Sequence, residues 1–573
     1  MKRRIGRADR GRWLSLPLAL AMILVACTGE AEPTTTTAPA TTTRPPTTTT
    51  VATTTTLSLG ECRDTFCVRY HIRPEAAWAD GTPVTAADFV FTYETIADPA
   101  YDIASREGYH LITGYEVVDE KTVLFAFDEI YAPWQTLFAY VLPAHVLEGQ
   151  PFDTAWDDAI TMGSGPFTFV EWVPEDRIVL ARNPDYWGQA QGDVQTLNVV
   201  FHPDAAAGAD ALDDGEIDVF YPQPYVSLME EVDSIDGIEW VTGVGPVWEY
   251  FGFNQDDVRL QQLFVRQAFT QGINREAIMD AVVRPITPDA QLLGNSVWLN
   301  GSVSYEDHYN SLFPYDPAAA EGLLSTNGCS RGEDGIYVCN GERLSFSWAT
   351  TSDNEARDLH FELARADLEA IGIEITPNFG PTSELLQTAN LQGGSDVWQT
   401  TNLAWVAQPD PAWGNSRFYC QGDALNGFGA LNFFRYCDEE VDVLIRRTDM
   451  IIDPSERAAT YNQADALWLA ATPMIPMYQR PTLLAWNSQI QGPGDNPSQV
   501  GPLWNVGDWT GQEEVTFGIE NEPESMNVLE PSGTEPETRF ITTAVLEGAF
   551  TITPDFEYAP LLVESAEPIV PEG

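Results

Sequence analysis

A threonine-rich stretch, residues 28–58, most constrains what this chain can fold into. It consists almost entirely of Thr, Pro and Ala, a composition that cannot bury a core and stays extended. At ~3.1 Å per residue it would reach roughly 95 Å as a polyproline helix. We therefore expect a disordered tether, with every folded lobe in the residues that follow. That remainder of the 573-residue chain is too long for one ordinary domain and predicts two to four lobes.

Residues 1–27 have the pattern of a secretion signal. Basic residues from Lys2 to Arg12 precede an apolar run, residues 13–26, that is too short to span a membrane. The run ends in Leu24-Val25-Ala26-Cys27, which resembles a lipobox. This pattern predicts an exported lipoprotein, anchored to the outer face of the cell membrane by lipidated Cys27. The alternative is an ordinary signal peptide with an incidental cysteine.

The charge of the chain excludes several partners. Asp and Glu number 85 against 29 Lys and Arg, which gives a net charge of −56. Nucleic-acid binding needs a basic face, and docking on anionic lipid needs basic residues as well. We therefore expect no nucleic acid as a partner, and contact with the membrane only through the lipid anchor. Such an acidic surface suits a highly soluble protein in a salty or acidic setting.

Six cysteines remain once Cys27 is set aside, and they stand in sequence-local pairs. An even number in an exported chain predicts disulfides, and local pairing is the economical choice among fifteen. No histidine lies at ligand spacing beside them, so we expect no metal. The expected disulfide cysteines are Cys62, Cys67, Cys329, Cys339, Cys420 and Cys437.

No catalytic motif is visible in the sequence. The six histidines are scattered without an HExxH pattern, and carboxylates are too abundant for one pair to stand out. A glycine-rich piece, Gly163-Ser164-Gly165-Pro166-Phe167, lacks the GK[ST] ending of a phosphate loop and the GxSxG of a nucleophile elbow. We therefore expect a protein that is not an enzyme and holds no cofactor.

The stretch from Trp78 to Glu94, WADGTPVTAADFVFTYE, carries the clearest local signal. Asp80 and Gly81 are typical of a tight turn. Thr85 is a good N-cap, and Asp88 stands three residues on, where an acid complements the helix dipole. The stretch predicts a turn followed by a capped helix.

This stretch, preceded by Tyr70-His71-Ile72-Arg73, resembles the signature of the family 5 extracellular solute-binding proteins. That family is the dipeptide- and oligopeptide-binding group that serves ABC importers. Further landmarks include Arg182-Asn183-Pro184-Asp185-Tyr186-Trp187-Gly188 and Val265-Arg266-Gln267-Ala268. The resemblance implies an α/β fold of the bilobal periplasmic-binding-protein type, in the large three-subdomain class, with the ligand cleft between two hinged lobes.

The resemblance also implies lobe boundaries and an unusual order. It places a small subdomain at 59–165, the main part of the first lobe at 166–255 plus 487–573, and the second lobe at 256–486. Residues 515–573 resemble the segment that opens the family's first lobe, so the body reads as a circular permutation. The alternative is a truncated second copy. Permutation predicts that residues 515–519 form a strand in the same sheet as the residues after Phe167.

The family's ligand contacts include a segment of the form W-x-A-D-Y-x-D-P, whose first Asp holds a peptide's ammonium group. The matching run here is Trp405-Val406-Ala407-Gln408-Pro409-Asp410-Pro411, so that Asp is replaced by Ala407. Asp410 or Asp396 could substitute for it. The expected ligand-binding residues are Trp398, Trp405, Ala407, Gln408, Asp410, Trp413, Arg417, Tyr131, Trp134, Ser532 and Thr534.

The resemblance implies a monomeric solute-binding protein that closes on a ligand and delivers it to an ABC permease and ATPase complex. The expected ligand is an oligopeptide. Alternatives are an oligosaccharide, given 17 Trp, or a receptor that reports ligand to a sensor kinase. A secreted hydrolase would need a nucleophile–base pair that the sequence does not show.

Overall fold

The computed structural model describes residue 62 and residues 64–352, 354–381, 385, 394–421 and 431–571. The signal sequence, Cys27 and the tether lie outside these described residues. Within them, no helix is both long enough and apolar enough to cross a membrane.

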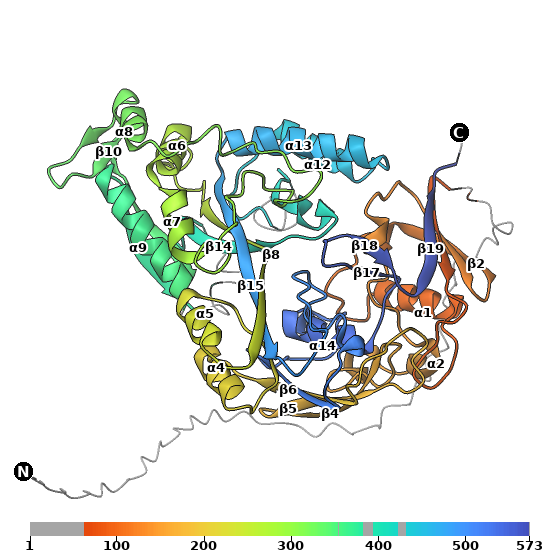
Figure 1. Cartoon of the computed structure of the whole chain (residues 1–573). Coiled ribbons are helices and arrows are strands. Elements are labelled where there is room, and N and C mark those ends of the chain that lie inside the picture. Colours follow the sequence, from red (N-terminus) through yellow and green to blue (C-terminus); the bar gives the residue numbers. More distant parts are fainter. Residues whose placement is uncertain are drawn as a thin grey trace, which may run out of the picture. The chain divides into compact units, whose positions relative to one another are not determined.

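The largest sheet in the described part of the chain is mixed and has ten strands. In spatial order its strands are β13 (Glu374–Gly380), β12 (Ser345–Thr351), β14 (Thr400–Val406), β8 (Ile238–Phe253), β15 (Met474–Asn487), β7 (Val219–Tyr221), β16 (Glu514–Ile519), β6 (Thr196–Phe201), β5 (Arg177–Arg182) and β4 (Phe167–Val173). The long strands β8 and β15 lie side by side and antiparallel (Figure 1).

Three smaller sheets accompany it among the described residues. The first, in spatial order, is β19 (Val563–Ile569), β1 (Phe66–Ile72), β3 (Thr122–Phe127) and β2 (Ile112–Asp119). The others are β11 (Glu342–Arg343), β10 (Tyr337–Cys339) and β9 (Ser330–Arg331), and the pair β17 (Phe550–Ile552) and β18 (Tyr558–Pro560).

Helices connect and cover these strands (Figure 1). They are α1 (Ala86–Ala97), α2 (Ala144–Leu147), α3 (Phe152–Ala155), α4 (Ala205–Asp213), α5 (Val226–Asp233), α6 (Leu263–Gly272), α7 (Arg275–Val282), α8 (Pro317–Thr326), α9 (Glu355–Ala370), α12 (Glu439–Thr448), α13 (Pro454–Ala470) and α14 (Pro536–Val545). Short 3-10 helices include η3 (Pro411–Arg417) and η6 (Pro531–Gly533).

The capped helix predicted after Trp78 is confirmed. The Thr82 amide donates to Asp80 at 2.9 Å, and Gly81 takes the positive φ of 84° that its turn requires. Thr85 is the N-cap of α1: its side chain accepts from the helix backbone, and Asp88 accepts the Thr85 amide at 2.7 Å. Both halves of the capping box are therefore present.

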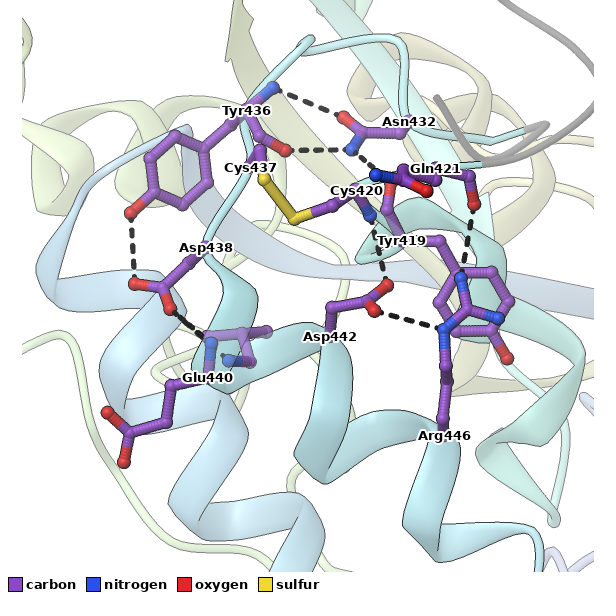
Figure 2. The surroundings of a disulfide bond; sticks show 11 residues. Tyr419, Cys420, Gln421, Asn432, Tyr436, Cys437, Asp438, Glu440, Asp442 and Arg446 are labelled. Atoms are coloured by element: carbon purple, nitrogen blue, oxygen red, sulfur yellow. Dashed lines mark hydrogen bonds and ion pairs between the residues drawn. A yellow bond between two sulfur atoms is a disulfide. The ribbon is translucent and has the colours of Figure 1, made fainter. Parts of the chain in front are cut away.

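All three predicted disulfides form as local pairs: Cys62–Cys67, Cys329–Cys339 and Cys420–Cys437. The last is braced on both sides (Figure 2). The Cys420 amide donates to Asp442 of α12 at 3.0 Å, and Asn432 donates to the Tyr436 carbonyl at 2.8 Å. The disulfide thus fixes the start of α12 against the chain that precedes it.

The C-terminal segment completes two sheets. β16 pairs in parallel with β6 and with β7, in the sheet that also contains β4. This confirms the strand predicted at 515–519. The last strand, β19, pairs antiparallel with β1, and Cys67 lies opposite Ile569. The two ends of the described chain therefore meet on neighbouring strands.

Buried apolar side chains gather into two large cores. The first core takes residues from β1, β3, α1, the turn before α1 and the C-terminal segment, among them Trp78, Phe125 and Phe517. The second takes residues from β12, from α6 to α9 and from α13, among them Trp348 and Trp468. β8 and β15 contribute to both cores. One end of each strand packs against the first core, and the other end packs in the second.

Candidate ligand-binding site

Residues from both cores line a cavity of about 1200 Å³. Tyr131, Ile519 and Phe550 belong to the first core, and Leu403 belongs to the second. A cavity of this size between two packed bodies, with apolar walls and a few polar groups, is typical of a ligand site.

The cavity is floored where β8 and β15 cross from one core to the other. Gly245 and Pro246 of β8 line it, together with Arg480 and Pro481 of β15. The pairing of the two strands shifts register between Gln479 and Pro481. Proline has no backbone N–H and cannot complete a ladder, so the strands are loosely tied at this point.

A buried carboxylate holds two arginines at this floor. Glu249 of β8 accepts from Arg357 at 3.2 Å, from Arg480 Nε at 2.6 Å and from Asn402 at 2.7 Å. Burial acts to raise the pKa of Glu249, but Arg480 and Arg357 together lower it to about 2. Arg357 and Arg480 themselves line the cavity.

His360 extends this network into the second core. Its Nδ1 lies 2.8 Å from Asn402 Oδ1, and its Nε2 lies 2.6 Å from the Tyr478 hydroxyl. Desolvation by burial lowers the pKa of His360 to about 4, although Glu249 acts in the opposite direction. The imidazole is therefore neutral at pH 7, and its hydrogen bonds fix the side chains beneath Arg480.

Two further carboxylates, Glu520 and Glu547, line the cavity, and no arginine among the described residues forms an ion pair with either. Burial raises the pKa of Glu520, which follows β16, to about 7, and neighbouring Glu537 adds to the rise. Burial likewise raises the pKa of Glu547 to about 7. Glu547 accepts from Tyr186 at 2.7 Å and from the Trp187 indole at 2.9 Å, both neutral donors. Protonation of these carboxylates near pH 7 changes the charge of the cavity wall.

Four of the predicted binding residues line the cavity: Tyr131, Gln408, Trp413 and Thr534. Trp413 lies in η3 and is 51% exposed. That exposure is unusual for a large aromatic side chain, and it leaves the ring available to a ligand. The ring is held in place because Asp410 caps the start of η3 and accepts from Arg457 at 2.6 and 2.9 Å.

The other predicted binding residues lie around the cavity but not in its wall. Trp405 is buried and stacks between Tyr250 and Phe433, with ring centroids 5.7 and 5.9 Å away. Arg417 is buried, donates to the Ser296 carbonyl and lies over the Phe418 ring. The remaining ones are Trp134, Trp398, Ala407, Asp410 and Ser532.

Sequence reasoning missed the charged residues of the wall, above all Arg357, Arg480, Glu520 and Glu547. One signal could have found Glu520. It directly follows β16, a strand with parallel neighbours, and ligands of α/β sheets bind outside the carboxyl ends of such strands. Arg357 and Arg480 come from distant segments and carry no local signal. The described residues contain no group of three His, Cys, Asp or Glu that could hold a metal.

Comparison with known proteins identifies the fold. The family model of the bacterial extracellular solute-binding proteins, family 5 (middle region), matches residues 61–424. Oligopeptide-binding protein OppA of Mycobacterium tuberculosis is 27% identical over 435 residues, which cover 74% of this chain and 71% of that protein.

Two solved structures share the fold. A periplasmic EDTA-binding protein, EppA, superposes with a TM-score of 0.71 at 23% identity, covering 78% of this chain and 85% of that one. The oligopeptide-binding protein AppA of Bacillus subtilis, in complex with a nonapeptide, gives 0.62 at 23% identity, covering 80% and 90%.

The family match spans more than half of the chain and includes the capped helix and the first half of the cavity wall. Proteins of this family are extracytoplasmic binding proteins of ABC importers rather than enzymes. The chain belongs to family 5 of the bacterial extracellular solute-binding proteins.

Proposed function

We propose that this chain binds an oligopeptide in the cavity between its two cores and hands it to an ABC permease and ATPase complex. The observation that carries the proposal is the cavity of about 1200 Å³, lined by residues of both cores, in a chain whose relative is an oligopeptide-binding protein. A ligand that touches both lobes favours the closed arrangement, because it gains contacts there that an open form lacks.

The hinge of this closure is the crossing of β8 and β15. The two strands join the lobes, and their ladder is interrupted at Pro481 opposite the stretch from Gly243 to Pro246. A few residues that lack regular pairing can absorb the change in φ and ψ that domain closure requires. The proposed lobes are residues 59–255 with 487–573, and residues 256–486, and the strands reach across this boundary: Trp248 and Phe253 of β8 pack in the second core, and Leu484 of β15 packs in the first.

Trp413 gives the ligand a flat aromatic face. Its ring is half exposed on the cavity wall, and a peptide backbone or an apolar side chain gains contact area by packing on it. Arg480 and Arg357 offer donors for a carboxylate, and Glu520 offers an acceptor for an ammonium group. Both chemistries occur in a peptide. Because Ala407 stands where the family has its ammonium-binding Asp, another carboxylate must bind the ammonium group of the peptide here.

A thermal-shift screen tests the proposal, since a ligand that binds only the folded protein raises its Tm. We expect peptides to raise the Tm of the full chain by several degrees at a hundred-fold excess over Kd. Trp413→Ala reduces that shift, whereas Trp240→Ala leaves it unchanged, because Trp240 is an exposed tryptophan outside the cavity wall. A shift with oligosaccharides and none with peptides would replace the proposed ligand class.

Transport and sensing are distinguished by uptake. Deleting the gene should abolish import of a labelled peptide if the chain serves a transporter. Unchanged import, with loss of a peptide-induced transcriptional response, would assign the chain to a sensor. Anchoring is tested separately: Cys27→Ser should move the protein from the membrane fraction to the medium without altering peptide binding.

We also propose that the body is circularly permuted relative to its family. The support is spatial: β16 lies between β6 and β7, β19 pairs with β1, and the disulfide sulfur of Cys62 is 3.8 Å from the Ile569 carbonyl. Residue 571 can therefore be joined to residue 62 without moving either strand.

Restoring the family order tests the permutation. In this variant residues 511–571 are placed directly before residue 62 and the chain ends at residue 510. We expect its Tm to lie within a few degrees of the natural order, with peptide binding kept. Deleting residues 511–573 should unfold the first lobe, since it removes a central strand of the large sheet. A deletion that stays folded and binds peptide would instead favour a dispensable second copy.

A further inference from the structure

The two cores touch a second time, away from the strands that join them. The Ala132 amide donates to the Asp449 carbonyl at 2.7 Å. Tyr558 of β18 contacts the backbone of Asp410 through its hydroxyl. Ile452 packs against the first core and Phe556 packs against the second. We call this contact the junction; it involves no continuous strand and can separate without unfolding either core.

The junction gathers negative charge from both sides. Asp449 directly follows α12, where the helix dipole already disfavours an anion. Asp410 lies on the same side, and the charge of exposed Glu107, which lines the cavity, acts on Asp449. Burial is the main cause that raises the pKa of Asp449 to about 7, and Asp410 and Glu107 raise it further.

The groups that oppose this rise are few. Asn415 donates to Asp449 at 3.0 Å, and Arg457 acts on Asp449 electrostatically. The Arg457 guanidinium is already bound by Asp410 in a bidentate pair, so much of its charge is compensated there. The other ionisable neighbours are tyrosines that are neutral at pH 7 and the partly exposed Arg446, namely Tyr131, Tyr419, Tyr461 and Arg446.

We propose that the junction is a pH-sensitive latch on the cavity, in which protonated Asp449 lets the two cores close and ionised Asp449 repels Glu107 and releases them. The inference rests on the proposed function, because it regulates access to the same cavity. Tyr131 and Tyr558 contact the junction and also line the cavity, so opening it exposes the ligand site.

The sign follows from proton linkage. In the closed form Asp449 is partly buried and feels the negative charge of Glu107, so it binds its proton tightly. Opening hydrates Asp449 and removes Glu107, so the proton is bound less tightly. The closed form is therefore favoured at acidic pH and weakened as pH rises through about 7. Between the two pKa values the closing constant falls by up to about ten-fold per pH unit.

Hydrogen exchange of the ligand-free full chain measures the latch directly, because the Ala132 amide is protected by its bond to Asp449. Asp449→Asn removes the charge and keeps an oxygen for Asn415. At pH 8.5 we expect the segment around Ala132 to exchange at least ten-fold faster in the natural protein than in Asp449→Asn. At pH 5.5 the two should exchange alike. Comparing the proteins at one pH cancels the intrinsic pH dependence of exchange.

Two further variants complete the design. Glu107→Gln, at an exposed position, should slow exchange at pH 8.5 in the same direction, and it carries the test alone if Asp449→Asn does not fold. Asp213→Asn, an exposed position on α4, is the control and should change nothing. Equal exchange in all proteins at pH 8.5 would overturn the latch. The two proposals fail independently. Equal exchange would contradict the latch and not the proposal of peptide binding, and failure of every peptide to bind would contradict peptide binding and not the latch.

Discussion

Glu249 at the floor of the cavity and Glu547 at its wall are buried to the same degree, with 2% and 3% of their surface exposed. Their pKa values are nevertheless about 2 and about 7. Burial opposes ionisation at both sites. Glu249 overcomes it with two arginines, while Glu547 is held by the neutral donors Tyr186, Trp187 and Ser164. The difference shows that the charge of the bonding partner, and not the depth of burial, decides whether a buried carboxylate is ionised at pH 7.

The composition of the chain helps to explain why buried carboxylates with raised pKa values, such as Glu547, recur. With 85 acidic and only 29 basic residues, carboxylates far outnumber the cations that could pair with them. Glu520 and Asp449 resemble Glu547, since burial raises the pKa of each to about 7. Two arginines, Arg357 and Arg480, meet Glu249 where the strands β8 and β15 join the two cores. This ion pair persists at ordinary pH values, whereas the charges of Glu520, Glu547 and Asp449 change near pH 7.

Removing the paired carboxylate should have the largest effect. Glu249→Gln leaves Arg357 and Arg480 without their negative partner, and breaking a buried pair typically costs about 3–5 kcal/mol. Urea unfolding at pH 7 measures the loss. Glu239→Gln, at an exposed position of the same strand, should stay within about 0.5 kcal/mol of the natural protein. If Glu249→Gln lost as little unfolding free energy as the control, the ion pairs of Glu249 with Arg357 and Arg480 would not contribute to stability.

Neutralising the unpaired carboxylate should act through pH. The folded pKa of Glu547 lies above the ordinary value of 4.5, so its contribution to stability is fully present below pH 4.5 and is lost as pH rises to about 7. The loss is roughly 3 kcal/mol. Glu547→Gln should remove that part of the decline in unfolding free energy between pH 4.5 and 7.

Glu249 predicts the opposite slope, because its folded pKa is lowered: its contribution is present above pH 4.5 and lost as pH falls toward 2. The natural protein should therefore be most stable in mildly acidic solution. If the unfolding free energy of Glu547→Gln fell above pH 4.5 as steeply as that of the natural protein, the raised pKa assigned to Glu547 in the cavity wall would be contradicted.

An exposed ion pair should have the smallest effect. Glu456 accepts from Arg447 at 2.7 Å, close to the 2.6 Å between Arg480 Nε and Glu249. Both partners of the exposed pair are more than half exposed, and such pairs contribute about 0–1 kcal/mol. Glu456→Gln should change the free energy of unfolding by less than 1 kcal/mol and lose that small effect in 1 M salt. A cost comparable to that of Glu249→Gln would show that the distance between the charges, rather than their desolvation, decides how much an ion pair contributes to stability.

Local sequence patterns predicted the local parts of this structure. The N-cap at Thr85 and the three disulfides depend on residues at most 17 positions apart, and all formed as expected. The strand at 515–519 was also predicted correctly, although it joins a sheet begun more than 300 residues earlier, because a family resemblance carried the long-range information.

The charged network could not be predicted in the same way. Glu249 and Arg480 are 231 residues apart and meet only because β8 and β15 pair in one register. Gln408, within the run that matches the family's binding segment, and Trp413, just after that run, were expected to bind ligand and do line the cavity. Trp405 of the run and Arg417 beyond it pack into the second core instead of the cavity wall, since sequence alone does not tell which face of a segment is buried.

Native mass spectrometry of the full chain with a mixed-length peptide library tests the central claim most directly. The account predicts a complex of one peptide per chain at pH 6, weakened in Trp413→Ala and unchanged in Trp240→Ala. No bound peptide under these conditions, or a one-to-one complex with an oligosaccharide in its place, would contradict it.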